Sequence, residues 1–128
     1  MRFLLDTCTF LWLNADPSKV PLRIRELFSD LENERFLSVV SVWEIALKSG
    51  TGRLQLPEPT AEYILKRREL NSAVSLALDE ETVLHLPKLP PIHADPFDRI
   101  LICQAIVHGL IILTPDEHIS SYPVRVMW

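Results

Sequence analysis

The chain has 128 residues, of which 48% are hydrophobic, and its formal net charge is −4. This length and apolar content predict one compact domain over residues 1–128 with a sizeable core. The negative charge argues against a protein that grips nucleic acid through a bulk positive field. No apolar run approaches the ~20 residues that cross a bilayer, so we expect a cytoplasmic protein with no membrane contact. Cys8 and Cys103 lack CxxC spacing and are expected as reduced core residues.

The chain begins with a short apolar run that ends at an acid. Residues 2–5, RFLL, predict a buried strand that delivers Asp6 at its end. Thr7 is expected to cap a short helix over residues 10–13. After the turn-like NADPSKVP, residues 21–33 predict a second helix with proline near its start.

The next strand and helix carry the second acid of interest. Residues 35–40, RFLSVV, predict a strand. Ser41 and Glu44 have the spacing of a capping box ahead of an apolar helix, which gives Glu44 a structural role as an alternative to a chemical one. Residues 59–71 then predict an amphipathic helix.

Three short segments lead to the second half of the chain. Residues 73–78, AVSLAL, predict a third strand, and residues 79–86 a short helix with an acidic first turn. The proline-rich residues 86–95 are expected as an irregular surface loop.

Residues 93–105, HADPFDRILICQA, place two acids at the start of an apolar helix. Pro96 suits the first helical position, Asp95 before it is a good N-cap, and Asp98 lies in the first turn. The mostly apolar circumference of this helix implies burial, and Gly109 is expected to end it.

The end of the chain repeats the pattern of a strand followed by an acid. Residues 110–113, LIIL, predict a strand, and Thr114 is expected to cap a short helix beginning near Asp116. Residues 124–127 predict a last short strand.

Strands separated by helices predict an α/β fold, a three-layer α/β/α sandwich with a central parallel sheet. Ligands of such sheets bind outside the carboxyl ends of the strands. Asp6, Glu44 and Asp116 each follow a predicted strand, and a long loop can bring Asp98 to the same edge. We therefore predict that these four acids converge.

Several neighbouring carboxylates repel one another and need a cation or raised pKa values. Mg²⁺ or Mn²⁺ prefers oxygen ligands and phosphate oxygens, so the cluster predicts metal-dependent hydrolysis of phosphodiesters. One ion or two are both compatible with the sequence.

Four segments in order carry a family resemblance, namely LLDT, SVWEIALKSGTGRLQLP, HADPFDRILICQA and LTPD. They resemble the PIN-domain ribonuclease toxins of the VapC type, and the similarity runs nearly end to end, including the terminal PVRVMW. The resemblance implies that Asp6, Glu44, Asp98 and Asp116 bind metal and cut RNA, with Asp95 in a supporting role. It also implies a homodimer and a cognate VapB-type antitoxin that covers the site.

Several basic residues are candidates to line the path by which RNA approaches the acids: Lys48, Arg53, the run Lys66 to Arg68, and Arg99. For the run Lys66 to Arg68, the ordinary alternative is a solvent-exposed helix face.

Several further residues near the acids allow both a structural and a functional interpretation. Thr7 and Thr114 either cap helices or hydrogen-bond metal-bound water or phosphate. His93 with the two aspartates after it forms HxDxxD, a mixed transition-metal pattern that lacks a second His or Cys nearby. Trp43 is expected in the core, where it would fix the helix of Glu44.

Three other functions are alternatives to the nuclease. A haloacid-dehalogenase-like phosphatase needs a second acid two residues after Asp6, where this chain has Cys8. A response-regulator receiver domain needs a phosphorylatable Asp after a middle strand and a late Lys, and no Lys follows Lys88. A catalytically weak PIN-like domain that only binds RNA or a partner stays open.

Overall fold

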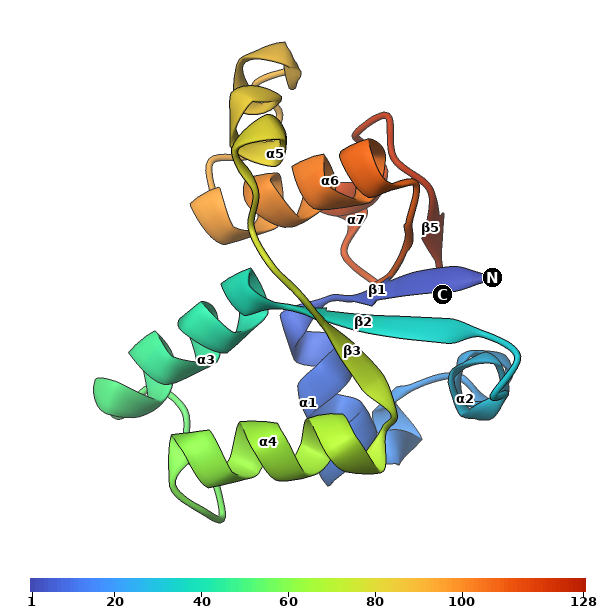
Figure 1. Ribbon diagram of the computed structural model, residues 1–128, viewed down its shortest axis with the longest axis vertical. Helices are drawn as coiled ribbons and strands as arrows, with labels where there is room; N and C mark the ends of the chain where they lie inside the picture. Colours follow the sequence, from blue (N-terminus) through green and yellow to red (C-terminus); the bar gives the residue numbers. More distant parts are fainter.

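A single five-stranded sheet forms the centre of the computed structural model, which describes residues 1–128 (Figure 1). Every strand pair is parallel, and the order is β3-β2-β1-β4-β5. The strands are β1 (Arg2–Leu5), β2 (Glu34–Ser38), β3 (Ala73–Leu76), β4 (Ile111–Leu113) and β5 (Val126–Met127). Along the chain, β2 and β3 are added on one side of β1, and β4 and β5 are then added on its other side. The direction of winding therefore changes beside β1, where open α/β sheets form their binding crevice.

Helices cover both faces of the sheet (Figure 1). On one face lie α1 (Thr7–Ala15), α2 (Leu22–Ser29), α3 (Val39–Gly50) and α4 (Thr60–Leu70). On the other lie α5 (Glu80–Leu84), α6 (Pro96–His108) and α7 (Glu117–Ser120). Two 3₁₀ turns, Pro17–Lys19 and Leu86–Lys88, complete the elements, the second within the segment expected to be irregular. No helix has the length and apolar character needed to span a membrane.

Side chains alternate between two separate hydrophobic cores along each strand. Phe3 and Leu5 pack among the residues of α1 to α4, while Leu4 packs among those of α6 and α7. In β4, Ile112 lies on the α6 side and its two neighbours on the other. Because both of their faces are buried, the central strands β1 and β4 are almost entirely apolar, RFLL and IIL. The predicted three-layer α/β/α sandwich is confirmed.

The second strand ends earlier than predicted, at Ser38. The Ser38 hydroxyl accepts a hydrogen bond from the amide of Val40 and caps α3, so Val39 and Val40 are helical although their type favours strands. The capping box proposed for Ser41 and Glu44 is therefore wrong. Glu44 lies in the second turn of α3, where its carboxylate has no amide to cap.

The two predicted threonine caps are also wrong. Asp6 occupies the N-cap position of α1 without a side-chain cap bond, and Thr7 donates instead to the Ser41 hydroxyl, 2.9 Å away. Asp116, and not Thr114, caps α7 by accepting from the amide of His118. Both threonine hydroxyls are thus free to form bonds between elements.

The ends of α6 follow the prediction. The Asp95 carboxylate accepts from the amides of Phe97 and Asp98, and Pro96 begins the helix. Gly109 ends it at a φ of 66°, a left-handed conformation that glycine adopts without strain. This helix start faces the carboxyl edge of the sheet.

Candidate metal centre

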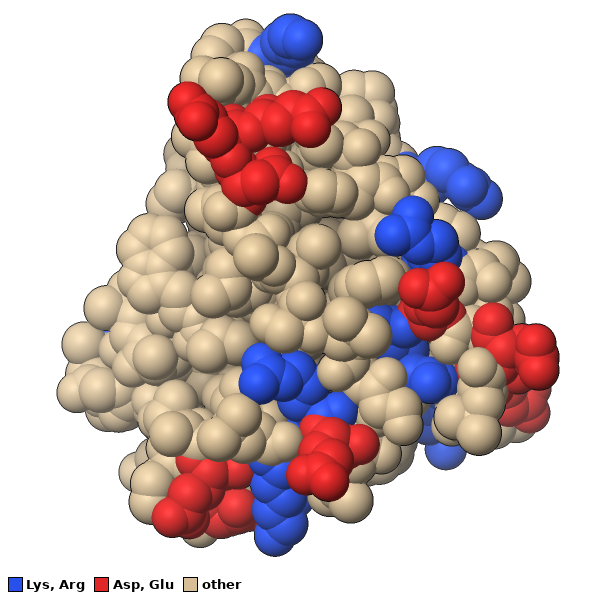
Figure 2. Space-filling view, in the orientation of Figure 1, with Lys and Arg blue, Asp and Glu red and all other residues tan.

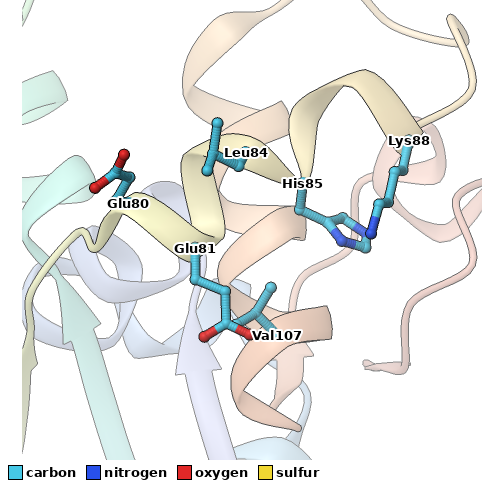
Figure 3. Close-up of a pocket in the computed structure, with 6 residues that line it drawn as sticks. All are labelled: Glu80, Glu81, Leu84, His85, Lys88 and Val107. Carbon is cyan, nitrogen blue, oxygen red and sulfur yellow. The ribbon is translucent and has the colours of Figure 1, made fainter.

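One pocket at the carboxyl edge of the sheet is lined by all of the acids singled out in the sequence. These are Asp6 after β1, Glu44 on α3, Asp95 and Asp98 at the start of α6, and Asp116 at the start of α7. The hollow drawn in Figure 3, between α5 and α6, is lined by none of them. The predicted convergence of the acids is present in the structure.

Asp6 is the most buried of these acids, with 5% of its surface exposed. Its Oδ2 accepts hydrogen bonds from the Thr114 hydroxyl at 2.8 Å and from the Cys8 thiol at 3.2 Å. Burial nevertheless raises the pKa of Asp6 above its ordinary value, and the charge of Glu44 adds to this. The carboxylate is therefore ionised at a cost that a bound cation would remove.

Cys8 lies partly exposed at this pocket, so its assignment to the core is wrong, while Cys103 is buried as expected. Burial and the neighbouring Asp6 carboxylate raise the pKa of the Cys8 thiol to about 12. The thiol thus stays protonated and acts as a donor to Asp6. Both cysteines are free.

Thr114 joins two of the acids through its hydroxyl. This hydroxyl donates to Asp6 and accepts from the amide of Asp116 at 3.0 Å. Asp116 in turn uses one carboxylate oxygen, Oδ1, to cap α7. No local sequence pattern predicts this hydrogen bond, because Thr114 and Asp6 are 108 positions apart.

Asp95 and Asp98 have separate environments although they are three residues apart. Asp95 Oδ1 is occupied by the two helix amides that it caps, whereas Asp98 Oδ2 lies 3.2 Å from His93 Nε2. Burial, followed by the negative charges of the other acids, raises the pKa of Asp98 to about 7. The negative charges of all four other acids of the pocket therefore act on Asp98.

His93 lies stacked on His118, with ring centroids 4.5 Å apart and ring planes at 4°. The lone pairs of an imidazole lie in its ring plane, so two parallel stacked rings cannot both bind one ion. The second histidine missing from the HxDxxD pattern is thus nearby but not in a ligating arrangement. His93 contacts the site through its hydrogen bond with Asp98.

Glu44 pairs with Lys48, whose Nζ lies 2.6 Å from Glu44 Oε2. This hydrogen bond raises the pKa of Lys48 above its ordinary value. Arg53 also lines the pocket. Arg99 instead donates to the Pro90 carbonyl and the Tyr122 hydroxyl, both at 3.1 Å, and holds the loop before α6.

Trp43 is 58% exposed, so its placement in the core is wrong. Its ring packs edge-on against Phe97, with centroids 4.8 Å apart. Phe97 precedes Asp98 and Trp43 precedes Glu44. The aromatic pair therefore joins the two helices that carry these acids.

The residues of the pocket fit a hard divalent cation. Five carboxylates offer oxygen ligands, the donor type that Mg²⁺ and Mn²⁺ prefer. Burial, together with the negative charges of neighbouring acids, raises the pKa values of Asp6 and Asp98, so the ionised forms of both are disfavoured in the pocket. A bound divalent ion would supply the missing positive charge.

Comparisons with known proteins find similarities over most of the chain. A family model described as PIN domain matches residues 3–124. Ribonuclease VapC22 of Mycobacterium tuberculosis (strain ATCC 25618 / H37Rv) is 26% identical over 93% of this chain and 90% of that protein. Ribonuclease VapC16 of the same strain is 34% identical over 48% of this chain and 43% of that protein.

Solved structures share the fold over nearly the whole chain. VapBC2 from Rickettsia felis, bound to a DNA fragment from its promoter, superposes with a TM-score of 0.76 at 13% identity, covering 99% of this chain and 98% of the other. DNA-bound VapBC from Salmonella typhimurium gives a TM-score of 0.73 at 19% identity, covering 99% and 97%.

Proposed function

The chain belongs to the PIN domain family, and from that membership and its pocket of acids we propose that it is a metal-dependent endoribonuclease, the toxin of a type II toxin–antitoxin module. The observation that carries this proposal is the gathering of Asp6, Glu44, Asp98 and Asp116 at one sheet edge. The relative matched over 93% of the chain is a ribonuclease by name. Residues 1–128 act as one nuclease domain in the cytoplasm.

The ligands of Mg²⁺ or Mn²⁺ would be Asp6, Glu44, Asp98 and Asp116. Asp95 would support them by capping the start of α6. When bound, such an ion lowers the pKa of a water ligand and stabilises negative charge on phosphoryl oxygens. Thr114 and Cys8 orient Asp6 by donating to its Oδ2. His93 fixes Asp98 by bonding its Oδ2. The buried contact of Thr114 with Asp6 holds this carboxylate in place before RNA arrives, which reduces the reorganisation that binding requires.

The test is cleavage of RNA by the purified chain without a partner. Structured and single-stranded RNAs are incubated with Mg²⁺ or Mn²⁺, with and without EDTA, beside Asp6→Asn and the control Asp30→Asn, which changes an exposed acid outside the pocket. We expect EDTA and Asp6→Asn each to reduce cleavage at least about 100-fold, the usual size of loss when a metal or charge-stabilising group is removed. Asp30→Asn should cleave like the wild type. Cleavage that persists in EDTA and in Asp6→Asn contradicts the metal-centre assignment.

The alternative function is a PIN-like domain that binds RNA or a partner without cutting. Tight RNA binding with no cleavage of any RNA, in either metal, would favour that alternative. In that case the acids would serve a binding site alone.

The proposal includes a VapB-type antitoxin and a homodimer. The structural neighbours include VapBC from Salmonella typhimurium and from nontypeable Haemophilus influenzae, and we extend that pairing to this chain. Co-expression with a small protein encoded beside it should suppress growth arrest and cleavage, and light scattering of the free chain should return twice its mass of 14.7 kDa. Healthy growth on induction of soluble wild-type chain alone would contradict the toxin role. It would not contradict the nuclease activity, which the cleavage assay tests independently.

A further inference from the structure

Lys48 lies at the mouth of the acid pocket, one helical turn after Glu44. Its side chain is 44% exposed, against 9% for that of Glu44. The buried end of this ion pair is therefore the carboxylate, and the exposed end is the ammonium. An ammonium on a flexible stem at such a position can change partners with little movement of the backbone.

Arg53 is held beside Lys48 by the backbone. The amides of Arg53 and Leu54 both donate to the Lys48 carbonyl, at 2.9 and 3.2 Å. Gly52 makes this turn possible with a φ of 77°, a left-handed value that strains other residues. Arg53 is exposed, lines the same pocket and forms no ion pair.

Three of the other four basic candidates are engaged elsewhere. Lys66 and Arg67 pair with Glu58, and Arg99 holds the loop before α6. Arg68 does not line the acid pocket. Figure 2 shows basic and acidic side chains in separate small groups on the face it presents, with no broad basic surface there. The basic residues that line the acid pocket itself are Lys48 and Arg53.

We infer that Lys48 and Arg53 form a phosphate-binding rim of the acid pocket, and that Lys48 exchanges the Glu44 carboxylate for a phosphate of the RNA backbone when substrate binds. This inference rests on the proposed nuclease function, because it assumes RNA as the ligand. In the free protein Lys48 offsets the charge of Glu44. In the complex the same ammonium, beside the Arg53 guanidinium, contacts a phosphate next to the scissile one.

The exchange predicts opposite effects on two ligands. Replacing Lys48 with methionine keeps the bulk of the side chain but removes its charge, so RNA binding should weaken. The same change frees Glu44 from its competing partner, so binding of a divalent cation should become tighter. A purely structural role for Lys48 would weaken both or neither.

The experiment measures the two ligands separately. RNA binding uses a fluorescein-labelled 20-nucleotide single-stranded RNA of mixed sequence, with Ca²⁺ replacing Mg²⁺, across a series of salt concentrations. Cation binding uses Mn²⁺ alone, followed by calorimetry without RNA. The variants are Lys48→Met, Arg53→Met, Lys48→Arg and the matched control Lys66→Met, a lysine away from the pocket.

Lys48→Met and Arg53→Met should each weaken RNA binding about tenfold, the size of one charged hydrogen bond. Each should reduce the slope of log K against log salt by about 0.7, one phosphate contact on a single strand. Lys48→Met should bind Mn²⁺ about two- to fivefold more tightly, the range of an exposed ion pair. Lys48→Arg should retain RNA binding, and Lys66→Met should match the wild type in both assays.

Unchanged RNA affinity and salt slope in Lys48→Met and Arg53→Met would overturn the inference, even if the wild type cleaves RNA. Weaker binding of the antitoxin with unchanged RNA binding would also overturn it, because the rim would then serve the protein partner. If the predicted changes occur but the wild type cuts no RNA, the phosphate rim stands and the nuclease proposal fails. Tighter Mn²⁺ binding by Lys48→Met would itself show that this variant is folded.

Discussion

At the scale of single residues, the site depends on hydroxyl and thiol groups that hold carboxylates. Asp6 is buried and would be costly to ionise without the donors Thr114 and Cys8. The Thr114 hydroxyl also accepts from the Asp116 amide, so one oxygen orders two acids from different elements. Such a contact would orient the proposed metal ligands without itself reaching the metal.

Thr114→Val should therefore weaken both the fold and the metal centre, whereas Thr114→Ser keeps the hydroxyl. Because the change removes one of the two side-chain donors of a buried carboxylate, we expect a loss of about 1 to 3 kcal/mol in the free energy of unfolding. Mn²⁺ affinity should fall about tenfold, as for other residues that orient metal ligands. Urea unfolding and calorimetry measure the two effects. Equal Mn²⁺ affinity in Thr114→Val and Thr114→Ser would contradict this role.

At the scale of elements, the site depends on the packing of α3 against α6. The ring of Trp43 on α3 packs against Phe97 on α6. The hydroxyl of Ser38, the N-cap of α3, donates a buried hydrogen bond to Gln104 of α6. Since Glu44 and Asp98 follow the two aromatic residues directly, we expect the aromatic contact to influence the spacing of these carboxylates. An exposed aromatic ring would then have a positional role that its exposure alone does not suggest.

Trp43→Leu should impair cleavage more than it impairs stability. Loss of one aromatic pair costs about 0.5 to 1.5 kcal/mol of unfolding free energy, whereas a displacement of about 1 Å at a catalytic site can cost 100-fold in rate. We expect kcat to fall at least about tenfold with a small change in melting temperature. Trp43→Phe, which keeps a ring against Phe97, should recover most of the activity. Full activity in Trp43→Leu would show that the spacing is set elsewhere.

At the scale of the whole molecule, the raised pKa of Asp98 makes stability depend on pH. The pKa of Asp98 is about 7 in the folded chain, against about 3.9 when unfolded. Between these values the folded chain keeps a proton that the unfolded chain has lost, so the free energy of unfolding falls as pH rises from about 4 to 7. Above pH 7 the penalty is constant.

Asp98→Asn should remove most of this pH dependence. In EDTA at pH 8 we expect the variant to be about 1 to 2 kcal/mol more stable than the wild type, after discounting for solvent screening at the pocket. Adding Mn²⁺ at pH 8 should stabilise the wild type, because the unfolded chain separates the acids, and stabilise the variant less. Urea unfolding from pH 4.5 to 8 tests this. Parallel stability curves for the two proteins would contradict the assignment of the raised pKa to Asp98.

The sequence by itself determined the layer architecture and the identity of the acids. Apolar strands alternating with helices leave few topologies, and parallel strands bring their carboxyl ends to one edge, so Asp6, Glu44, Asp98 and Asp116 could be named without coordinates. Asp95 and Gly109 were also readable, because a helix cap depends on neighbours within a few residues.

Only the tertiary structure decided how the acids are supported. The hydroxyl of Thr114 finds Asp6 across 108 positions, and Trp43 leaves the core to meet Phe97. Ser38 is the N-cap of α3, a role that the sequence pattern assigned to Ser41. Helix boundaries read from a pattern alone are uncertain by a few residues. Contacts between distant residues depend on how the layers pack, and a local pattern in one sequence carries no record of that packing.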